Sequence, residues 1–374
     1  MSAAYRPAWA EVDLAAITAN ARALSELAPL CAVVKANGYG HGAVEVAEAA
    51  LAGGAVWLAV ALVEEGVQLR DAGIEGRVLL LSEPPPDAMG EAIGRGLTPT
   101  LYTDAGVKAA AAAAADAPES WAVHVKVDTG MHRVGAPIDD VDAVVAAVRA
   151  IGGLELEGIW SHLAVADEPG QDEFTATQLR RFHAVLDRLA ANGVRPPLVH
   201  LANSAGAIAH RDARCEMVRC GISLYGHAPA PAVTQGPPLR PALALKARVS
   251  HLATLDQGER ISYGRRYETP TRTVVATIPL GYADGVPRRL FDVGGQVLIG
   301  GARRPIAGTI TMDQLMVDCG PDAAVAVGDE VVLIGRQGAE EITAEEWADA
   351  LGTISYEVLC GIGPRVPRVY LGPT

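Results

Sequence analysis

The feature that most constrains the fold is a regular alternation of short apolar runs with longer amphipathic stretches, from about residue 30 to residue 227. Continuous apolar strands that alternate with helices indicate a parallel sheet covered on both faces. About eight such units in roughly 200 residues predict a closed (β/α)8 barrel of the TIM type. An open doubly wound sheet is the alternative, but it would normally carry a G-x-G-x-x-G motif after its first strand, and that motif is absent. The apolar runs occupy residues 30–34, 57–61, 78–82, 99–102, 122–127, 156–164, 198–204 and 217–226.

The pattern changes near Gln235, where strand-like runs separated by Gly-rich turns replace the amphipathic stretches. We therefore predict two domains: a β/α barrel over residues 1–234 and a mostly antiparallel β domain over residues 235–374. One helix is expected near the end of the second domain, where Thr343 and Glu346 form a capping box. The strand-like runs cover residues 242–255, 271–285, 295–301, 303–318 and 328–336.

Charge and cysteine usage exclude several classes of protein. A formal net charge of -13 argues against nucleic acid as a partner, because phosphate binding needs clustered Lys and Arg. The first residues lack the basic and apolar regions of a signal peptide, and no run approaches the roughly 20 apolar residues of a membrane span. Five scattered cysteines favour a reducing cytoplasm. No His, Cys and Asp cluster has metal-ligand spacing, so no required metal is predicted.

The active site of a β/α barrel lies at the carboxyl ends of its strands. Lys35 ends the first apolar run and is one of only four lysines in the chain. Partial desolvation would lower the pKa of such a lysine and let it form a Schiff base with an aldehyde cofactor, although a surface lysine at a strand end is the alternative. Together with Lys35, the residues near the strand ends suit an anionic cofactor and proton transfer. They are Lys126, Arg133, His162, Asn203, Ser204, Arg219 and Gly221.

The segment VVKANGYGHG, residues 33–42, closely resembles the cofactor-lysine motif of the alanine racemase family. The family consists of cytoplasmic isomerases that use pyridoxal 5'-phosphate to interconvert L-alanine and D-alanine and supply D-alanine for peptidoglycan of the cell wall. Its fold, a β/α barrel followed by a β domain, agrees with the pattern above. The resemblance covers essentially the whole chain and continues in the family order through VDTGMHRVG, GIWSHLAVADE, HLANSAG, MVRCGISLYG, ISYGRRY, PLGYADGV, AGTITMDQLMVD and ISYEVLCGIGPRVPRVY.

The resemblance implies a role for each matching residue. Lys35 would hold the cofactor and act as one catalytic base, and Tyr263 would act as the other. Arg219 would face the pyridine nitrogen, with His162 linking it to Tyr263. Lys126 would support Arg133, and it matches a lysine that is carbamylated in many members of the family. The residues that would bind the cofactor phosphate are Tyr39, Ser204, Tyr356 and the backbone of Gly221 and Ile222. The residues on the substrate side would be Arg133, Met312, Asp313 and Tyr282.

The family assembles as a homodimer, and the resemblance implies that the partner subunit supplies Tyr263 and Met312 to each site. Three positions depart from the common pattern. Thr311 stands where many members have Cys, Gly38 where Ala is frequent, and His132 where Gly is frequent. Thr311 changes the hydrogen bonding beside Met312, which leaves the exact substrate range open.

Racemisation removes the α-proton of an amino acid and returns a proton to the opposite face, so it needs one base on each face. A tyrosine serves as a base only when its pKa falls from about 10, which a nearby cation favours. We expect His162 and Arg219 to form that cationic chain. Because an arginine stays protonated, Arg219 would not hand a proton to the pyridine nitrogen, and we expect this to suppress transamination.

Several alternatives stay open from the sequence. Taken singly, most of these residues could have structural roles, as His162 could in the core and Tyr263 between strands, and Asp128 is expected to hold the turn before Arg133. A racemase of serine or of broad specificity would share most of the motifs. A non-catalytic cofactor-binding protein of the barrel-only kind would lack the β domain and Tyr263. A decarboxylase of the same barrel class would carry different C-terminal motifs.

Overall fold

The computed structural model describes residues 5–115, 120–233 and 235–372, and its contacts divide the chain into two compact units. The first apolar runs form strands of a parallel barrel, as predicted. Every residue of β2, β3 and β4 is buried, which is typical of strands covered on both faces. The barrel strands are β2 (Leu30–Val33), β3 (Trp57–Val60), β4 (Val78–Leu80), β5 (Thr100–Leu101), β6 (Trp121–Asp128), β8 (Leu154–Trp160), β9 (Leu198–His200) and β10 (Val218–Cys220).

These strands close on themselves. One parallel arc runs in the order β10-β2-β3-β4 and another in the order β5-β6-β8-β9, with the short β7 (Ala136–Pro137) added beside β6. A parallel bridge between Leu79 and Thr98 joins β4 to the residues before β5. At the other seam, Arg219 N donates to Ala202 O at 3.0 Å, just beyond β9. The prediction of a TIM-type barrel is therefore confirmed.

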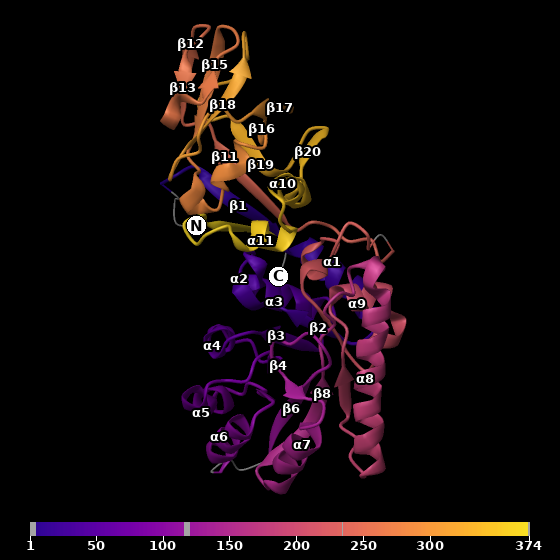
Figure 1. The fold of residues 1–374 in the computed structure, drawn as a ribbon. Coiled ribbons are helices and arrows are strands. Elements are labelled where there is room, and N and C mark those ends of the chain that lie inside the picture. The colour runs from indigo at the N-terminus through magenta and orange to yellow at the C-terminus, as the bar shows by residue number, and fades with distance from the viewer. Residues whose placement is uncertain (1–4, 116–119, 234, 373–374) are drawn as a thin grey trace. The chain divides into compact units, whose positions relative to one another are not determined.

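Helices follow the strands and lie around them (Figure 1). The longest shows why the sequence forms a helix here: α8 buries Thr175, Gln178, Phe182, Val185 and Leu189, at the spacing of one helical face. Gly193 follows its end with φ 73°, the left-handed conformation that ends many helices. The helices of this unit are α1 (Leu14–Ser25), α2 (Lys35–Tyr39), α3 (Ala43–Ala52), α4 (Val63–Asp71), α5 (Pro86–Gly94), α6 (Asp104–Ala114), α7 (Val141–Ala150), α8 (Asp172–Ala191) and α9 (Ser204–Ala209).

The second unit is mostly β-structure, as predicted from the strand-like runs after Gln235. Its largest sheet has the order β17-β16-β19-β11-β1-β21, with β20 beside β19, and a smaller sheet has the order β12-β15-β18. The predicted capping box begins α10 (Ala344–Leu351), where Glu346 N donates to Thr343 Oγ1. A second short helix is α11 (Ser355–Cys360). The strands are β11 (Leu243–Arg248), β12 (His251–Leu255), β13 (Arg260–Ile261), β14 (Tyr267–Glu268), β15 (Thr273–Ile278), β16 (Gln296–Ile299), β17 (Ala302–Pro305), β18 (Leu315–Gly320), β19 (Glu330–Gln337), β20 (Glu340–Ile342) and β21 (Arg368–Leu371).

The N-terminal strand belongs to the β unit by its pairing. β1 (Ala8–Asp13) pairs antiparallel with β11 and parallel with β21, and Gly40–Gly42 also groups with this unit. The expectation that residues 1–234 form one domain therefore does not extend to β1. The alternating burial of AWAEVD marks a strand, but only the partners β11 and β21, more than 200 residues away, decide which unit it joins. Among the described helices, none combines the length and apolarity needed to cross a bilayer.

Candidate active site

Lys35 stands at the carboxyl end of β2, at the start of a backbone turn of unusual conformation. The following residues Ala36, Asn37, Gly38 and Tyr39 all have positive φ, between 50° and 60°. This left-handed conformation costs energy for residues with a side chain, and such strain concentrates at functional sites. The carboxylate of Glu65 helps to hold the turn, because it accepts hydrogen bonds from Ala36 N at 2.6 Å and from Ala61 N at 2.8 Å. The turn fixes Lys35 at the mouth of the barrel.

Arg219 on β10 is a buried cation held by neutral acceptors. Its Nη1 donates to Nδ1 of His200 at 2.9 Å, and its Nη2 donates to Ser161 O at 2.8 Å and Leu201 O at 3.1 Å. Its guanidinium carbon lies 4.4 Å from the centre of the Trp160 ring, a cation–π geometry. Burial lowers the pKa of Arg219 to about 10, so the side chain still carries its charge near neutral pH.

His162 follows β8 and contacts Arg219 through Nδ1, which lies 3.2 Å from Nη2. Burial and then the charge of Arg219 hold the pKa of His162 well below its usual value. The imidazole is therefore neutral near pH 7, and Nδ1 accepts from the arginine. Within the expected chain of His162 and Arg219, the histidine therefore contributes a neutral ring, because burial and the neighbouring positive charges disfavour its protonated form. The charge of the pair resides on Arg219.

Lys126 on β6 lies within the same cluster of positive charge. Burial, followed by the charges of Arg133 and Arg219, lowers its pKa to about 7, and Lys35 contributes in the same direction. Arg133 itself is exposed, beyond a turn that Asp128 holds by accepting from Gly130 N at 2.9 Å. This is the structural role expected of Asp128. Four cations thus gather at one end of a barrel whose chain has a net charge of -13.

Tyr39, Ser204 and Gly221 lie next to one another beside this cluster. The Gly221 N–H donates to Ser204 Oγ at 3.0 Å, and the Tyr39 ring stacks on Tyr225 with ring centres 4.8 Å apart. A Cβ atom placed on Gly221 would overlap the Tyr39 hydroxyl, so a side chain at this position would displace the Tyr39 ring. Ile222 continues from Gly221 into a short 3-10 turn. Two hydroxyls and a backbone N–H therefore lie close together at the mouth of the barrel.

The β unit carries the other predicted site residues, three of which are large and exposed. Tyr263, Met312 and Tyr282 expose 73%, 52% and 43% of their surface. Tyr263 follows Ser262, which has φ 63°, and its carbonyl accepts from Thr309 Oγ1 at 2.9 Å. Tyr356 lies on α11 and is half-buried.

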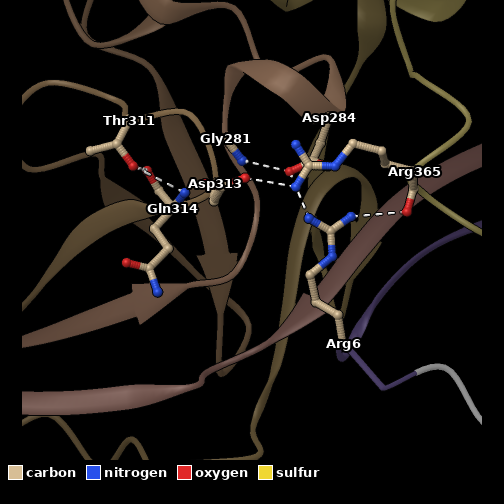
Figure 2. Close-up of polar contacts among 7 residues, drawn as sticks. All are labelled: Arg6, Gly281, Asp284, Thr311, Asp313, Gln314 and Arg365. Carbon is tan, nitrogen blue, oxygen red and sulfur yellow. Dashed lines mark hydrogen bonds and ion pairs between the residues drawn. The ribbon is translucent and has the colours of Figure 1, made fainter.

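A buried carboxylate supports the loops that carry Tyr282 and Asp313 (Figure 2). Asp284 is fully buried, and it accepts from Arg6 Nη1 at 2.8 Å and from Gly281 N at 3.0 Å. Arg365 lies 3.5 Å from the same carboxylate and donates to Asp313 Oδ1 at 2.6 Å. The predicted site residue Asp313 is therefore tied to the interior of the β unit through Arg365.

Thr311 closes the turn that presents Met312 and Asp313. Its Oγ1 donates to Gln314 O at 2.8 Å and accepts from Gln314 N at 3.1 Å (Figure 2). Both bonds stay within the turn. The hydroxyl of Thr311 therefore holds the turn that presents Met312 and Asp313.

Both units match known sequence families. Residues 12–229 match the family model described as "Alanine racemase, N-terminal domain", and residues 242–370 match "Alanine racemase, C-terminal domain". The alanine racemase of Symbiobacterium thermophilum is 51% identical over 373 residues, which cover 99% of this chain and 98% of that protein. The chain belongs to the alanine racemase family. The prediction of an amino-acid racemase, an isomerase, is thereby confirmed at the level of the family.

Solved structures of alanine racemase family members share the whole fold. The alanine racemase from Streptomyces coelicolor has a TM-score of 0.93 and 40% identity, and each chain is covered completely. The histidine racemase from Leuconostoc mesenteroides has a TM-score of 0.90 and 30% identity, with 99% of both chains covered. These comparisons confirm the predicted barrel followed by a mostly β domain. They also show that this fold serves racemases of different amino acids.

In this member of the racemase family, the sequence pattern predicted the basic residues and hydroxyls at the barrel mouth. It did not predict the residues that contact Arg219 or that hold the turn after Lys35. His200 and Trp160 contact Arg219, and Glu65 holds the turn after Lys35. A histidine within the apolar run LVHLANS was a usable signal, because a polar side chain in a buried strand needs a partner. Glu65 carries no such signal, since many acidic residues begin helices.

Proposed function

We propose that this protein interconverts L-alanine and D-alanine with pyridoxal 5'-phosphate as its cofactor. The observation that carries the proposal is the cation cluster of Lys35, Lys126, Arg133 and Arg219 at the carboxyl ends of barrel strands. A chain with a net charge of -13 gathers positive charge there for an anionic ligand. A phosphorylated cofactor and the carboxylate of an amino acid are both such ligands.

The residues present fit this cofactor. The hydroxyls of Tyr39 and Ser204 and the backbone amide of Ile222, which lie beside Gly221, would donate hydrogen bonds to the phosphate oxygens. Arg219 would face the ring nitrogen, and its charged state suits a nitrogen that accepts a hydrogen bond. Lys35 would bind the aldehyde carbon. When bound, pyridoxal phosphate supplies the conjugated system that stabilises negative charge on the substrate α-carbon.

Two bases would serve the two faces of the substrate. Lys35 would take or return the α-proton on one face, and the hydroxyl of Tyr263 of the partner subunit would do so on the other. Because His162 is neutral and its Nδ1 accepts from Arg219, its Nε2 carries a hydrogen. That N–H would donate to the phenolate oxygen and stabilise it. Arg133 would bind the substrate carboxylate, with Lys126 beside it.

We further propose a homodimer with shared active sites. The support is that Tyr263, Met312 and Tyr282, which the family resemblance assigns to a site, are exposed on the β unit and so are available to a partner subunit. In the dimer these residues, with Asp313, would line the substrate side of a site, and Tyr356 would bind the cofactor phosphate. The two units would then contribute to the same reaction from different subunits.

The decisive experiment measures D-alanine formed from L-alanine by the purified protein loaded with cofactor. We expect wild type to form D-alanine, Lys35→Ala to form none, and Tyr263→Phe to lose at least about a hundredfold in rate, because each direction of the reaction uses both bases. Lys108→Ala and Tyr5→Phe are the matched controls, because both side chains are exposed and outside the site. A protein that binds the cofactor but forms no D-alanine would refute the proposal.

The same assay decides the substrate range. L-serine and L-histidine are run in parallel, because a histidine racemase shares this fold and Thr311 stands beside Met312. We expect L-alanine to give the highest kcat/KM. A higher value for L-serine would instead assign a serine or broad-specificity racemase.

We propose that the enzyme acts in the cytoplasm and that its product, D-alanine, is used for peptidoglycan synthesis. Growth of a bacterial D-alanine auxotroph on medium without D-alanine, after expression of this chain, tests that role. Failure of an active, expressed enzyme to restore growth would contradict it.

A further inference from the structure

Two histidines lie fully buried in the barrel below Arg219. His124 is on β6, two residues before Lys126, and His200 is the last residue of β9. Bulky aliphatic side chains usually fill the interior of such barrels in layers. Buried polar groups are retained only where they are hydrogen-bonded, and both rings are. Packing alone therefore does not explain why two histidines occupy positions where aliphatic residues are usual.

The histidines belong to a continuous polar chain that leads away from Arg219. Arg219 Nη1 lies 2.9 Å from His200 Nδ1, and His200 Nε2 lies 2.9 Å from His124 Nδ1. His124 Nε2 lies 3.3 Å from Glu157 Oε2. The chain ends at Arg77, whose Nη2 lies 2.6 Å from Glu157 Oε1 and whose side chain is half-exposed.

The protonated Arg219 at one end and the Glu157 carboxylate at the other determine which atom donates and which accepts in every bond of the chain. Arg219 is protonated, so His200 Nδ1 must accept, and its hydrogen is on Nε2. His200 then donates to His124 Nδ1, which leaves the hydrogen of His124 on Nε2, facing the Glu157 carboxylate. Burial lowers the pKa of both rings, so each is neutral and carries a single hydrogen. Every donor in the chain meets an acceptor.

The barrel leaves room for this chain at a glycine. β8 lies between β6 and β9, and Gly158 on β8 is the register partner of His124. The His124 ring crosses Gly158 to reach His200. A Cβ atom on Gly158 would lie 2.6 Å from His124 Nδ1, the atom that accepts from His200. The link between the two rings therefore depends on the absence of a side chain at this position.

We propose that Glu157, His124 and His200 form a positioning relay that fixes the tautomer of His200 and so locks the orientation of Arg219. The inference rests on the proposed function, in which Arg219 faces the ring nitrogen of the cofactor. If the hydrogen of His200 were on Nδ1, it would oppose the Arg219 N–H and displace the guanidinium. Glu157 disfavours that tautomer of His200 through its hydrogen bond to His124. Arg77 neutralises the charge of the Glu157 carboxylate at the outer end of the chain.

The first test reads the tautomers directly. Nitrogen-15 NMR of the cofactor-free protein labelled at histidine, with signals assigned by His124→Gln and His200→Gln, should show both rings neutral with hydrogen on Nε2. Hydrogen on Nδ1 of either ring would overturn the proposal. The measurement needs no turnover, so an inactive wild type with these tautomers would refute the proposed function and leave the relay intact.

The second test breaks the relay at its far end. In Glu157→Leu the His124 N–H loses its acceptor, so we expect mixed tautomers of His200 and a kcat about tenfold lower, the lower end of what the loss of such supporting partners costs. KM should change less than about twofold. Glu157→Gln should restore most of the kcat, because its amide oxygen accepts the same bond. Glu155→Leu, an exposed position on the same strand, is the matched control.

Gly158→Ala provides an independent variant with Glu157 intact. We expect it to displace the His124 ring, break its bond to His200 and give the same mixed tautomers and lower kcat as Glu157→Leu. The relay is overturned if Glu157→Leu and Gly158→Ala are folded by circular dichroism and keep wild-type tautomers of His200. It is also overturned if the tautomers change while kcat and cofactor affinity stay at wild-type values.

Discussion

The Nζ atom of Lys126 lies 4.4 Å from the centre of the Trp160 ring, and the guanidinium carbon of Arg219 lies 4.4 Å from the same ring. Trp160 therefore contacts two cations that both belong to the cluster at the barrel mouth. The ring is almost fully buried, so it excludes water from them. Loss of hydration disfavours the charged form of a lysine much more readily than that of an arginine. This explains why the pKa of Lys126 falls to about 7 while Arg219 stays charged.

Lys126 should react with carbon dioxide. Only a neutral amine forms a carbamate, and with a pKa of about 7 a large fraction of this side chain is neutral under physiological conditions. Carbon-13 NMR in labelled bicarbonate should show a carbamate signal that disappears in Lys126→Ala. In Lys246, burial lowers the pKa but Glu11 and Glu330 raise it more, so Lys246→Ala should keep the signal. A signal that survives in Lys126→Ala would contradict the assignment.

Lys126 should also make stability depend on pH in a defined direction. Its pKa is about 7 in the folded chain against 10.5 when unperturbed, so between these values the unfolded chain binds the extra proton. Stability therefore rises with pH across that window, and the cost of the buried charge is fully present below about pH 7. Urea unfolding in CO2-free buffer should show the stability of wild type, relative to Lys126→Met, increasing from about pH 7 to about pH 9.5. A constant or falling difference would disprove the lowered pKa.

Gly221→Ala should weaken cofactor binding. The new methyl group would overlap the Tyr39 hydroxyl and displace this proposed phosphate ligand. We expect at least about a tenfold increase in the Kd for pyridoxal phosphate, measured by titration of its absorbance, equivalent to about 1.4 kcal/mol. Gly90→Ala is the matched control, because a Cβ atom there meets nothing within 4 Å. Equal affinities in the two variants would remove Gly221 from the phosphate site.

Asp284→Asn should destabilise the β unit. The carboxylate is fully buried beside Arg6 and Arg365, and removal of one partner from a buried ion pair typically costs about 3–5 kcal/mol. Urea unfolding followed by a β-unit signal should show a loss of this order. Asp313→Asn is the comparison, because the exposed pair of Asp313 with Arg365 should contribute less than about 1 kcal/mol. Similar losses in both variants would show that burial of Asp284 is unimportant.

Much of the candidate site was accessible from the sequence because its signals are local. Lys35 ends an apolar strand, and the residues near the other strand ends were placed at the barrel mouth by the rule that parallel strands share a direction. The charge state of His162 was not accessible in this way. It depends on burial and on cations brought from β2, β6 and β10, which no local pattern reveals.

The sequence by itself determined the barrel strands, the β domain after residue 235 and the position of Lys35, because apolar periodicity and turn residues act over a few neighbouring positions. Only the tertiary structure decided that β1 joins the β unit and that His200 reaches His124 across Gly158. These features are contacts between segments far apart in the chain. Their formation depends on which strands become neighbours and how much space remains between them, and both are properties of the folded molecule.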